Sequence, residues 1–172
     1  MRNRPVIIGL ALLAIAIGVL VFLSGHDENV RDTAATAAEN PSPASTAVSF
    51  TELAHGLHSS VLTRVNYSIT SAAEFKELWK LTDATVALPA VDFKTHMVLA
   101  VFAGEKPSAG SAIAVSAIKD AGNRMVSVAL TKPDATCKAV RPALSPYEII
   151  AVPATTLPLT HEDLLTPVSC SK

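Results

Sequence analysis

A cysteine and a histidine come closest to a nucleophilic pair in this chain. Cys137 supplies a thiol, and His161 would supply the base that activates it if the fold brought the two together. No serine lies in the Gly-x-Ser-x-Gly turn that presents the nucleophile of α/β-hydrolases. No pair of carboxylates stands out for general acid–base hydrolysis. We therefore expect no catalytic residues, and a hydrolase built on Cys137 and His161 remains the less favoured alternative.

The histidines do not form a strong metal-binding pattern. His55 and His58 are near neighbours, and in a helix their spacing would place both rings on one face. Gly56 and the strand-like flanking residues argue against such a helix. Two cysteines are also too few for a four-thiolate zinc site. We expect neither a metal nor another cofactor.

The charge of the chain argues against nucleic-acid binding. Fourteen Lys and Arg residues face 15 Asp and Glu residues, for a formal net charge of −1. Binding to phosphates needs a concentrated excess of positive charge. We therefore expect no nucleic-acid partner.

A glycine-bounded loop is the strongest candidate for a contact surface. Residues 104–110 read Gly-Glu-Lys-Pro-Ser-Ala-Gly, and the next residues are Ser-Ala rather than the Lys-Ser/Thr of a phosphate-binding loop. The loop is therefore predicted to be a wide turn between strands. We predict that it contacts a partner through Gly104, Lys106, Pro107, Gly110 and Ser111.

The first 25 residues predict a membrane anchor. Val6–Leu23 is an uncharged apolar run, long enough as a helix to span about 27 Å of the bilayer. Arginines precede it and acids follow it, so the N-terminus is expected in the cytoplasm and the rest of the chain outside. The expected location is the inner membrane, with a single span and the C-terminal domain in the periplasm or outside the cell. Secretion after cleavage of a signal peptide remains the alternative, although the run is longer than a usual signal core.

Two further regions follow the anchor. Residues 26–47 are rich in Ala, Thr, Ser and acids, without apolar periodicity, and are predicted to be a flexible tether. Residues 48–172 are long enough for one globular domain. Because an exported chain with two cysteines more often pairs them, we predict a Cys137–Cys170 disulfide that pins the C-terminal tail to this domain.

The elements that would position these residues are mostly strands. Ser71 and Glu74 have the spacing of a helix capping box, and an apolar stripe follows, so a helix is predicted from 71 to about 82. Alternating or continuous apolar runs predict strands, and a Gly-Asn turn near 120–123 predicts a hairpin. These strands are predicted at 48–53, 61–69, 96–103, 111–118, 125–130, 147–152 and 156–160. The predicted fold class is α+β: a mostly antiparallel curved sheet or partial barrel of six to seven strands with one packed helix.

A series of short motifs runs in order between residues 61 and 153. It comprises Phe75-x-x-Leu78-Trp79, Leu88-Pro89-x-Val91-Asp92-Phe93, His96-Met97-Val98, Gly104-x-x-Pro107-x-x-Gly110-x-x-Ile113, Pro133, Cys137 and Ser145-Pro146-Tyr147-x-Ile149-Ile150. The series resembles the C-terminal domain family of PrcB, the lipoprotein subunit of the dentilisin protease complex. The resemblance implies a membrane-attached, extracytoplasmic accessory protein without catalytic residues of its own, which associates with a protease complex.

These observations lead to a functional expectation. We expect a non-catalytic, membrane-anchored accessory protein that binds another protein. The alternative is a domain that binds a small ligand or the cell envelope, in a pocket lined by Trp79 between the predicted helix and the sheet.

Overall fold

The computed structural model describes residues 44–170. The predicted anchor Val6–Leu23 and nearly all of the predicted tether lie outside the described residues, and both stay predictions. Within residues 44–170, none of the helical segments has the length and apolar character needed to cross a bilayer.

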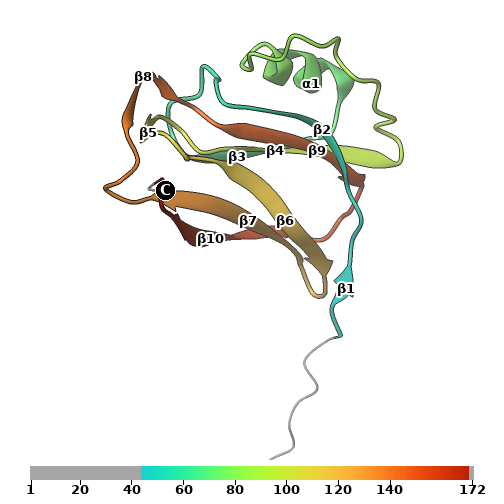
Figure 1. Cartoon of the computed structure of the whole chain (residues 1–172). Helices are drawn as coiled ribbons and strands as arrows, with labels where there is room; N and C mark the ends of the chain where they lie inside the picture. The colour runs from blue at the N-terminus through green and yellow to red at the C-terminus, as the bar shows by residue number, and fades with distance from the viewer. Residues whose placement is uncertain (1–43, 171–172) are drawn as a thin grey trace, which may run out of the picture. The chain divides into compact units, whose positions relative to one another are not determined.

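Two four-stranded sheets form the body of the domain (Figure 1). Sheet A has the order β1-β6-β7-β10, in which β7 and β10 are parallel and the other neighbours antiparallel. Sheet B has the order β2-β9-β4-β3 and is antiparallel throughout. The strands of sheet A are β1 (Thr46–Ala47), β6 (Ile113–Asp120), β7 (Arg124–Pro133) and β10 (Leu159–Val168). Those of sheet B are β2 (Thr51–Gly56), β3 (Val65–Ile69), β4 (His96–Phe102) and β9 (Tyr147–Pro153), and a separate pair consists of β5 (Lys106–Ser108) and β8 (Ala139–Leu144).

The main core lies between the two sheets. Alternate residues of β4 and β9 face alternate residues of β6 and β7, because side chains on a strand point to opposite faces in turn. The buried members are Met97, Leu99, Val101, Ala103, Ile113, Val115, Ile118, Val126, Val128, Leu130, Ile150 and Val152.

The single helix of the described residues, α1 (Ala72–Trp79), covers the other face of sheet B. The Glu74 backbone N–H donates to Ser71 Oγ at 3.3 Å, and the Glu74 carboxylate accepts from the Thr70 N–H and the Ser71 hydroxyl. These bonds lower the pKa of Glu74, with the Thr70 N–H the largest cause. The predicted N-terminal cap is therefore confirmed. Phe75 and Leu78 are the buried residues of the helix.

The predicted hairpin at 120–123 is also confirmed. Asp120 pairs with Arg124 across the turn. The Arg124 guanidinium is 3% exposed and donates to both Asp120 carboxylate oxygens at 2.7 Å. The same guanidinium donates to the Pro153 carbonyl, so it links the hairpin of sheet A to the end of β9 in sheet B.

The prediction of one curved sheet or partial barrel was wrong in its architecture, although the mostly antiparallel β character with one helix was correct. Two open sheets are present because the continuous apolar run of β4 must be covered on both faces. The helix layer buries Val98, Ala100 and Phe102, while sheet A buries the alternate residues. The described residues also hold ten strands rather than six or seven. The short strands β1, β5 and β8 were not predicted.

The last strand was predicted in the wrong place and with the wrong length. Residues 156–160 were expected to form a short edge strand, whereas β10 spans Leu159–Val168. It pairs with β7 in parallel over its whole length, from Leu159 opposite Arg124 to Val168 opposite Pro133. Nearly all residues of β10 are exposed, so its sequence has no alternation of apolar and polar residues that would predict a strand.

Candidate functional site

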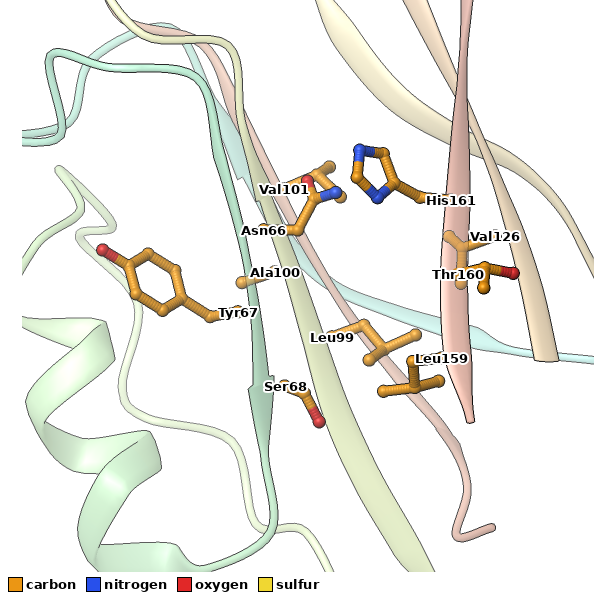
Figure 2. A pocket seen from close by; sticks show the side chains of 10 residues that line it. All are labelled: Asn66, Tyr67, Ser68, Leu99, Ala100, Val101, Val126, Leu159, Thr160 and His161. Atoms are coloured by element: carbon orange, nitrogen blue, oxygen red, sulfur yellow. The ribbon is translucent and has the colours of Figure 1, made fainter. Parts of the chain in front are cut away.

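A cleft opens between the two sheets where their last strands, β3 and β10, face each other (Figure 2). Its volume is about 140 Å³. Both strands end their sheets, so each has one hydrogen-bonding edge without a strand partner among the described residues. The cleft thus combines a hollow between layers with two open strand edges.

The floor of the cleft is apolar and its rim is polar. Leu99 and Val101 of β4 and Val126 of β7 line the floor. Asn66 approaches from β3, and Leu159 and His161 approach from β10, as Figure 2 shows. An apolar floor with a polar rim favours the binding of an apolar group that is attached to hydrogen-bonding groups.

The alternation of the two edge strands explains why the rim is polar. Asn66 and Ser68 pair with Val101 and Leu99, so they face the same side as the main core. Tyr67 points the other way, where its ring meets Phe102 edge-on at 5.7 Å. Polar side chains thus occupy the inward face of β3, where apolar ones would have sealed the two sheets together.

Polar side chains also lie on the inward face of β10. His161 and Asp163 lie opposite Val126 and Val128 in the parallel register, so both are on the inward face of the strand. Asp163 forms an ion pair with Arg64, with Nη2 to Oδ1 at 2.6 Å and Nε to Oδ2 at 3.2 Å. This ion pair links β10, two residues after His161, to the residue that precedes β3. Each of its two charges is compensated by the other.

The predicted contact loop is largely a structural corner. Lys106, Pro107 and Ser108 form β5, which pairs with β8. Gly104 and Ser111 are buried, and the Ser111 hydroxyl donates to the Ser108 carbonyl at 2.8 Å. Lys106 is partly exposed, and Pro107 and Gly110 are exposed. A binding role for Gly104, Lys106, Pro107, Gly110 and Ser111 stays a prediction, and these residues do not line the cleft.

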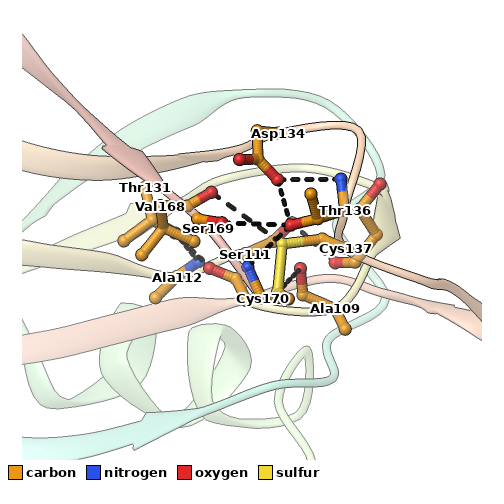
Figure 3. The surroundings of a disulfide bond; sticks show 12 residues. Ala109, Ser111, Ala112, Thr131, Asp134, Thr136, Cys137, Val168, Ser169 and Cys170 are labelled. Atoms are coloured by element: carbon orange, nitrogen blue, oxygen red, sulfur yellow. Dashed lines mark hydrogen bonds between the residues drawn. A yellow bond between two sulfur atoms is a disulfide. The ribbon is translucent and has the colours of Figure 1, made fainter. Parts of the chain in front are cut away.

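The predicted disulfide is present and lies against this loop (Figure 3). Cys137 and Cys170 are joined, with their Cα atoms 4.8 Å apart. A Cβ built on Gly110 would lie 3.4 Å from the Cys170 sulfur, so the loop and the bridge are in contact. The Cys170 N–H donates to Thr136 Oγ1 at 3.0 Å, and Thr136 in turn donates to Asp134. Cys170 is therefore fixed to the domain.

The disulfide removes the basis of the Cys137–His161 hydrolase. Neither cysteine of the bridge is a free thiol, and a cysteine acts as a nucleophile only as its thiolate. His161 also lies on the strand that leads to Cys170, nine residues before it. At about 3.3 Å per residue this is roughly 30 Å. Because Cys137 is bonded to Cys170, the structure also keeps His161 and Cys137 far apart.

A buried acid, Glu148, is a second polar feature between the sheets. It is 6% exposed, and its carboxylate accepts a hydrogen bond from the Val115 N–H. Val115 lies at a β-bulge, where the pairing of β6 with β7 shifts register between Val115 and Ala117. Burial raises the pKa of Glu148, and the nearby Glu52 raises it further. Its structural role is to satisfy a backbone donor at the bulge.

His55 lies opposite Glu148 on β2 and is exposed. Its ring Nδ1 is 2.7 Å from Glu52 Oε1, and this hydrogen bond raises the pKa of His55. Among residues 44–170, no three His, Cys, Asp or Glu side chains are positioned to hold a metal ion.

The pocket predicted between the helix and the sheet is filled by side chains. Trp79 packs edge-on against Phe75 at 5.6 Å and joins the second core with Leu81. The groove beside α1 is instead lined by Tyr67, Ile69 and the exposed side of the helix. Trp79 is not among the residues that line this groove.

Sequence reasoning missed both the cleft and Glu148. A signal for Glu148 existed, since it is a lone acid inside the apolar run Tyr-Glu-Ile-Ile-Ala-Val. The signal for the cleft was weaker. His161 and Asp163 alternate with residues that show no apolar period, and only the parallel pairing with β7 reveals that these two side chains face inward.

Comparison with known proteins gives one match. Searches of curated proteins and of solved structures returned no similar protein. Residues 97–153, about a third of the chain, match the sequence profile of the family described as PrcB C-terminal. They run from β4 to β9, so the match contains the inner strands of both sheets, whereas β3 and β10 lie outside it. The match therefore supports a PrcB C-terminal-like domain over residues 97–153.

Proposed function

We propose that this protein is an accessory subunit that binds another protein outside the cytoplasm, as a component of a protease complex. The observation that carries the proposal is the match of residues 97–153 to the PrcB C-terminal family. The family resemblance suggests an accessory role in a protease assembly. The disulfide is consistent with an oxidising compartment, where such bonds persist.

The cleft between β3 and β10 suits a polypeptide segment better than a whole small ligand. The cleft of about 140 Å³ is smaller than the roughly 300–1,000 Å³ of typical ligand pockets. It is instead flanked by open strand edges, which are a common means of binding an extended segment. The proposed arrangement is an anchor at Val6–Leu23, a tether that ends before β1, and a domain that presents these edges to a partner.

Co-purification tests the proposal. The full-length protein, crosslinked in intact cells and purified from solubilised membranes, is expected to retain the same protein partner in independent preparations, and that partner is expected to include a protease subunit. Deletion of this chain is expected to change the activity or the abundance of that protease. Crosslinked preparations that reproducibly contain this chain alone would contradict the proposal.

A further inference from the structure

We propose that the cleft between β3 and β10 binds one aromatic side chain, carried by an extended polypeptide segment that pairs with the free edge of β10. This inference deepens the proposed function and rests on it, because it states the chemistry of the partner segment. The size of the cleft, its polarity, its charges and the condition of the two edges support it.

The size of the cleft fits a single ring. Its volume of about 140 Å³ is close to that of an apolar cavity of about 150 Å³ that takes up benzene. The floor is formed by Leu99, Val101 and Val126, with Leu159 beside them, and these side chains offer only apolar contacts. A ring inserted there would leave water and contact both sheets.

The polar rim of the cleft indicates which kind of molecule the aromatic ring belongs to. The Asn66 side-chain NH2 and the His161 imidazole offer hydrogen-bonding atoms at the mouth, while the Asn66 side-chain oxygen accepts from Arg64. Arg64 and Asp163, which flank the cleft, neutralise each other. A free charged metabolite would therefore find no uncompensated opposite charge in that pair. The peptide groups on either side of an internal aromatic residue are neutral and hydrogen-bonding, so a polypeptide segment suits the rim.

The two strand edges differ in how open they are. β3 has five residues, and the Arg64 guanidinium donates to the carbonyls of Val65 and Phe102 at the start of that strand. β10 has ten residues, and those from Leu159 to Pro167 are exposed. Its outer edge has no strand partner within residues 44–170. Pairing of a partner strand is therefore expected along β10, up to the point where Pro167 lacks an N–H.

The pleat of a strand links this pairing to the cleft. Alternate side chains of a strand added to β10 would point to the same side as His161, toward sheet B. One of them would lie over the cleft while the next points to solvent. A segment with an aromatic residue at that position gains backbone hydrogen bonds from β10 and apolar burial from the cleft, a combination typical of strand addition.

Binding of defined peptides to the full-length protein in detergent micelles tests this inference. One blocked peptide has the sequence Thr-Val-Thr-Phe-Thr-Val-Thr, and its matched partner has Ala in place of Phe. We expect the Phe peptide to shift the NMR signals of Val101, Val126 and His161 and to slow amide exchange along β10. Loss of the buried ring is expected to weaken binding by about tenfold to a hundredfold.

Two variants with the same substitution complete the design. Ser68 is exposed on the inward face of β3 beside the cleft, so Ser68→Trp is expected to fill the mouth and abolish binding of the Phe peptide. Ser45 is exposed just before β1, at the opposite edge of sheet A from β10, so Ser45→Trp is expected to bind the peptide normally. Equal affinities of the Phe and Ala peptides for the wild-type protein would overturn the inference without relying on any variant. Binding of free N-acetylphenylalanine amide as tightly as the Phe peptide would also overturn it, because the segment would then contribute nothing.

The outcome can be separated from that of the proposed function. If Ser68→Trp still retains the crosslinked protein partner as the wild type does, the cleft proposal is wrong and the accessory function stands. If the Phe peptide binds in the cleft although no protein partner is ever retained, the cleft proposal stands and the accessory function is wrong.

Discussion

Arg64 and Asp163 form an ion pair that joins the last strands of the two sheets. The residues are 99 positions apart in the sequence, and their side chains are 25% and 35% exposed. The guanidinium of Arg64 additionally donates to the side-chain oxygen of Asn66 and to two backbone carbonyls. The two residues therefore contribute unequally to stability, since Arg64 stabilises the start of β3 as well as the contact with Asp163.

This asymmetry gives the first prediction. Arg64→Met is expected to lower the free energy of unfolding by about 1–2 kcal/mol, because it removes bonds to carbonyls and to Asn66 as well as the ion pair. Asp163→Asn is expected to cost less than about 1 kcal/mol. Urea unfolding of both single variants and the double variant gives the coupling energy. The exposed Glu77–Lys80 pair serves as the control, with an expected coupling below about 0.5 kcal/mol. A larger cost for Asp163→Asn than for Arg64→Met would contradict this account.

The Cys137–Cys170 bridge closes a loop with a sequence separation of 33. Replacement of both cysteines by serine is expected to lower the free energy of unfolding by about 3–4 kcal/mol, mainly because the unfolded chain gains freedom. Denaturant unfolding with and without reductant measures the effect. Mass labelling should detect no thiols in the untreated folded protein and two after reduction. Labelling of two thiols before reduction would refute the bridge.

Glu148 makes stability depend on pH. Its pKa is raised above its usual value of 4.5 by burial, so the folded state binds its proton more tightly than the unfolded state does. By linkage, the stability contributed by the protonated form is full below pH 4.5 and is lost as the pH rises through the raised pKa. We expect Glu148→Gln to remove this fall while keeping an acceptor for the Val115 N–H. Glu148→Ala, which leaves that donor unpaired, is expected to cost about 1–3 kcal/mol at all pH values.

His55 also makes stability depend on pH, but over a different pH range from Glu148. The hydrogen bond to Glu52 raises the pKa of His55 above 6.5, so its stabilising contribution is lost only as the pH rises beyond that value. The ring is exposed, which keeps the contribution small. Unfolding curves of Glu148→Gln and His55→Gln between about pH 4 and 8 separate the two. An unchanged slope between pH 4.5 and 6.5 in Glu148→Gln would rule out Glu148 as its source.

Two glycines provide a matched test of backbone conformation. Gly104 has a φ of +74°, and a Cβ there would lie 2.8 Å from the backbone nitrogen of Arg64. Gly104→Ala is expected to cost about 1–3 kcal/mol from the left-handed conformation alone, and more because backbone must move. A Cβ at Gly122 would have nothing within 4 Å, so Gly122→Ala is expected to change stability by less than about 1 kcal/mol. Thermal unfolding of the two variants is sufficient, and equal costs would contradict the contact at Gly104.

The parts of the fold that were predictable are those fixed by local chemistry. Ser71 and Glu74 predict the start of α1 because the cap depends on residues three positions apart. The apolar run from His96 predicts β4, although the sequence does not say which layer covers each face. The two cysteines could be paired by their number and their expected compartment.

The remaining features depend on contacts between distant segments. Nothing near His161 indicates that β10 pairs with β7 in parallel, since the register connects residues about 35 positions apart. The cleft exists only because Asn66 and His161 come to face each other from different sheets. A pattern of neighbours in sequence cannot contain that information, which is why the predicted contact loop at 104–111 and the observed cleft are different places.

The position of β10 has a consequence for how the protein is made. It is the last strand among the described residues, and it covers the edge of β7, whose paired residues are synthesised about 35 positions earlier. Until β10 has been synthesised, β7 presents an open row of backbone donors and acceptors next to an apolar core face, a feature that invites pairing with other chains. Completion of β10 removes that risk, and the Cys137–Cys170 bridge, which cannot form earlier, then makes the closure permanent.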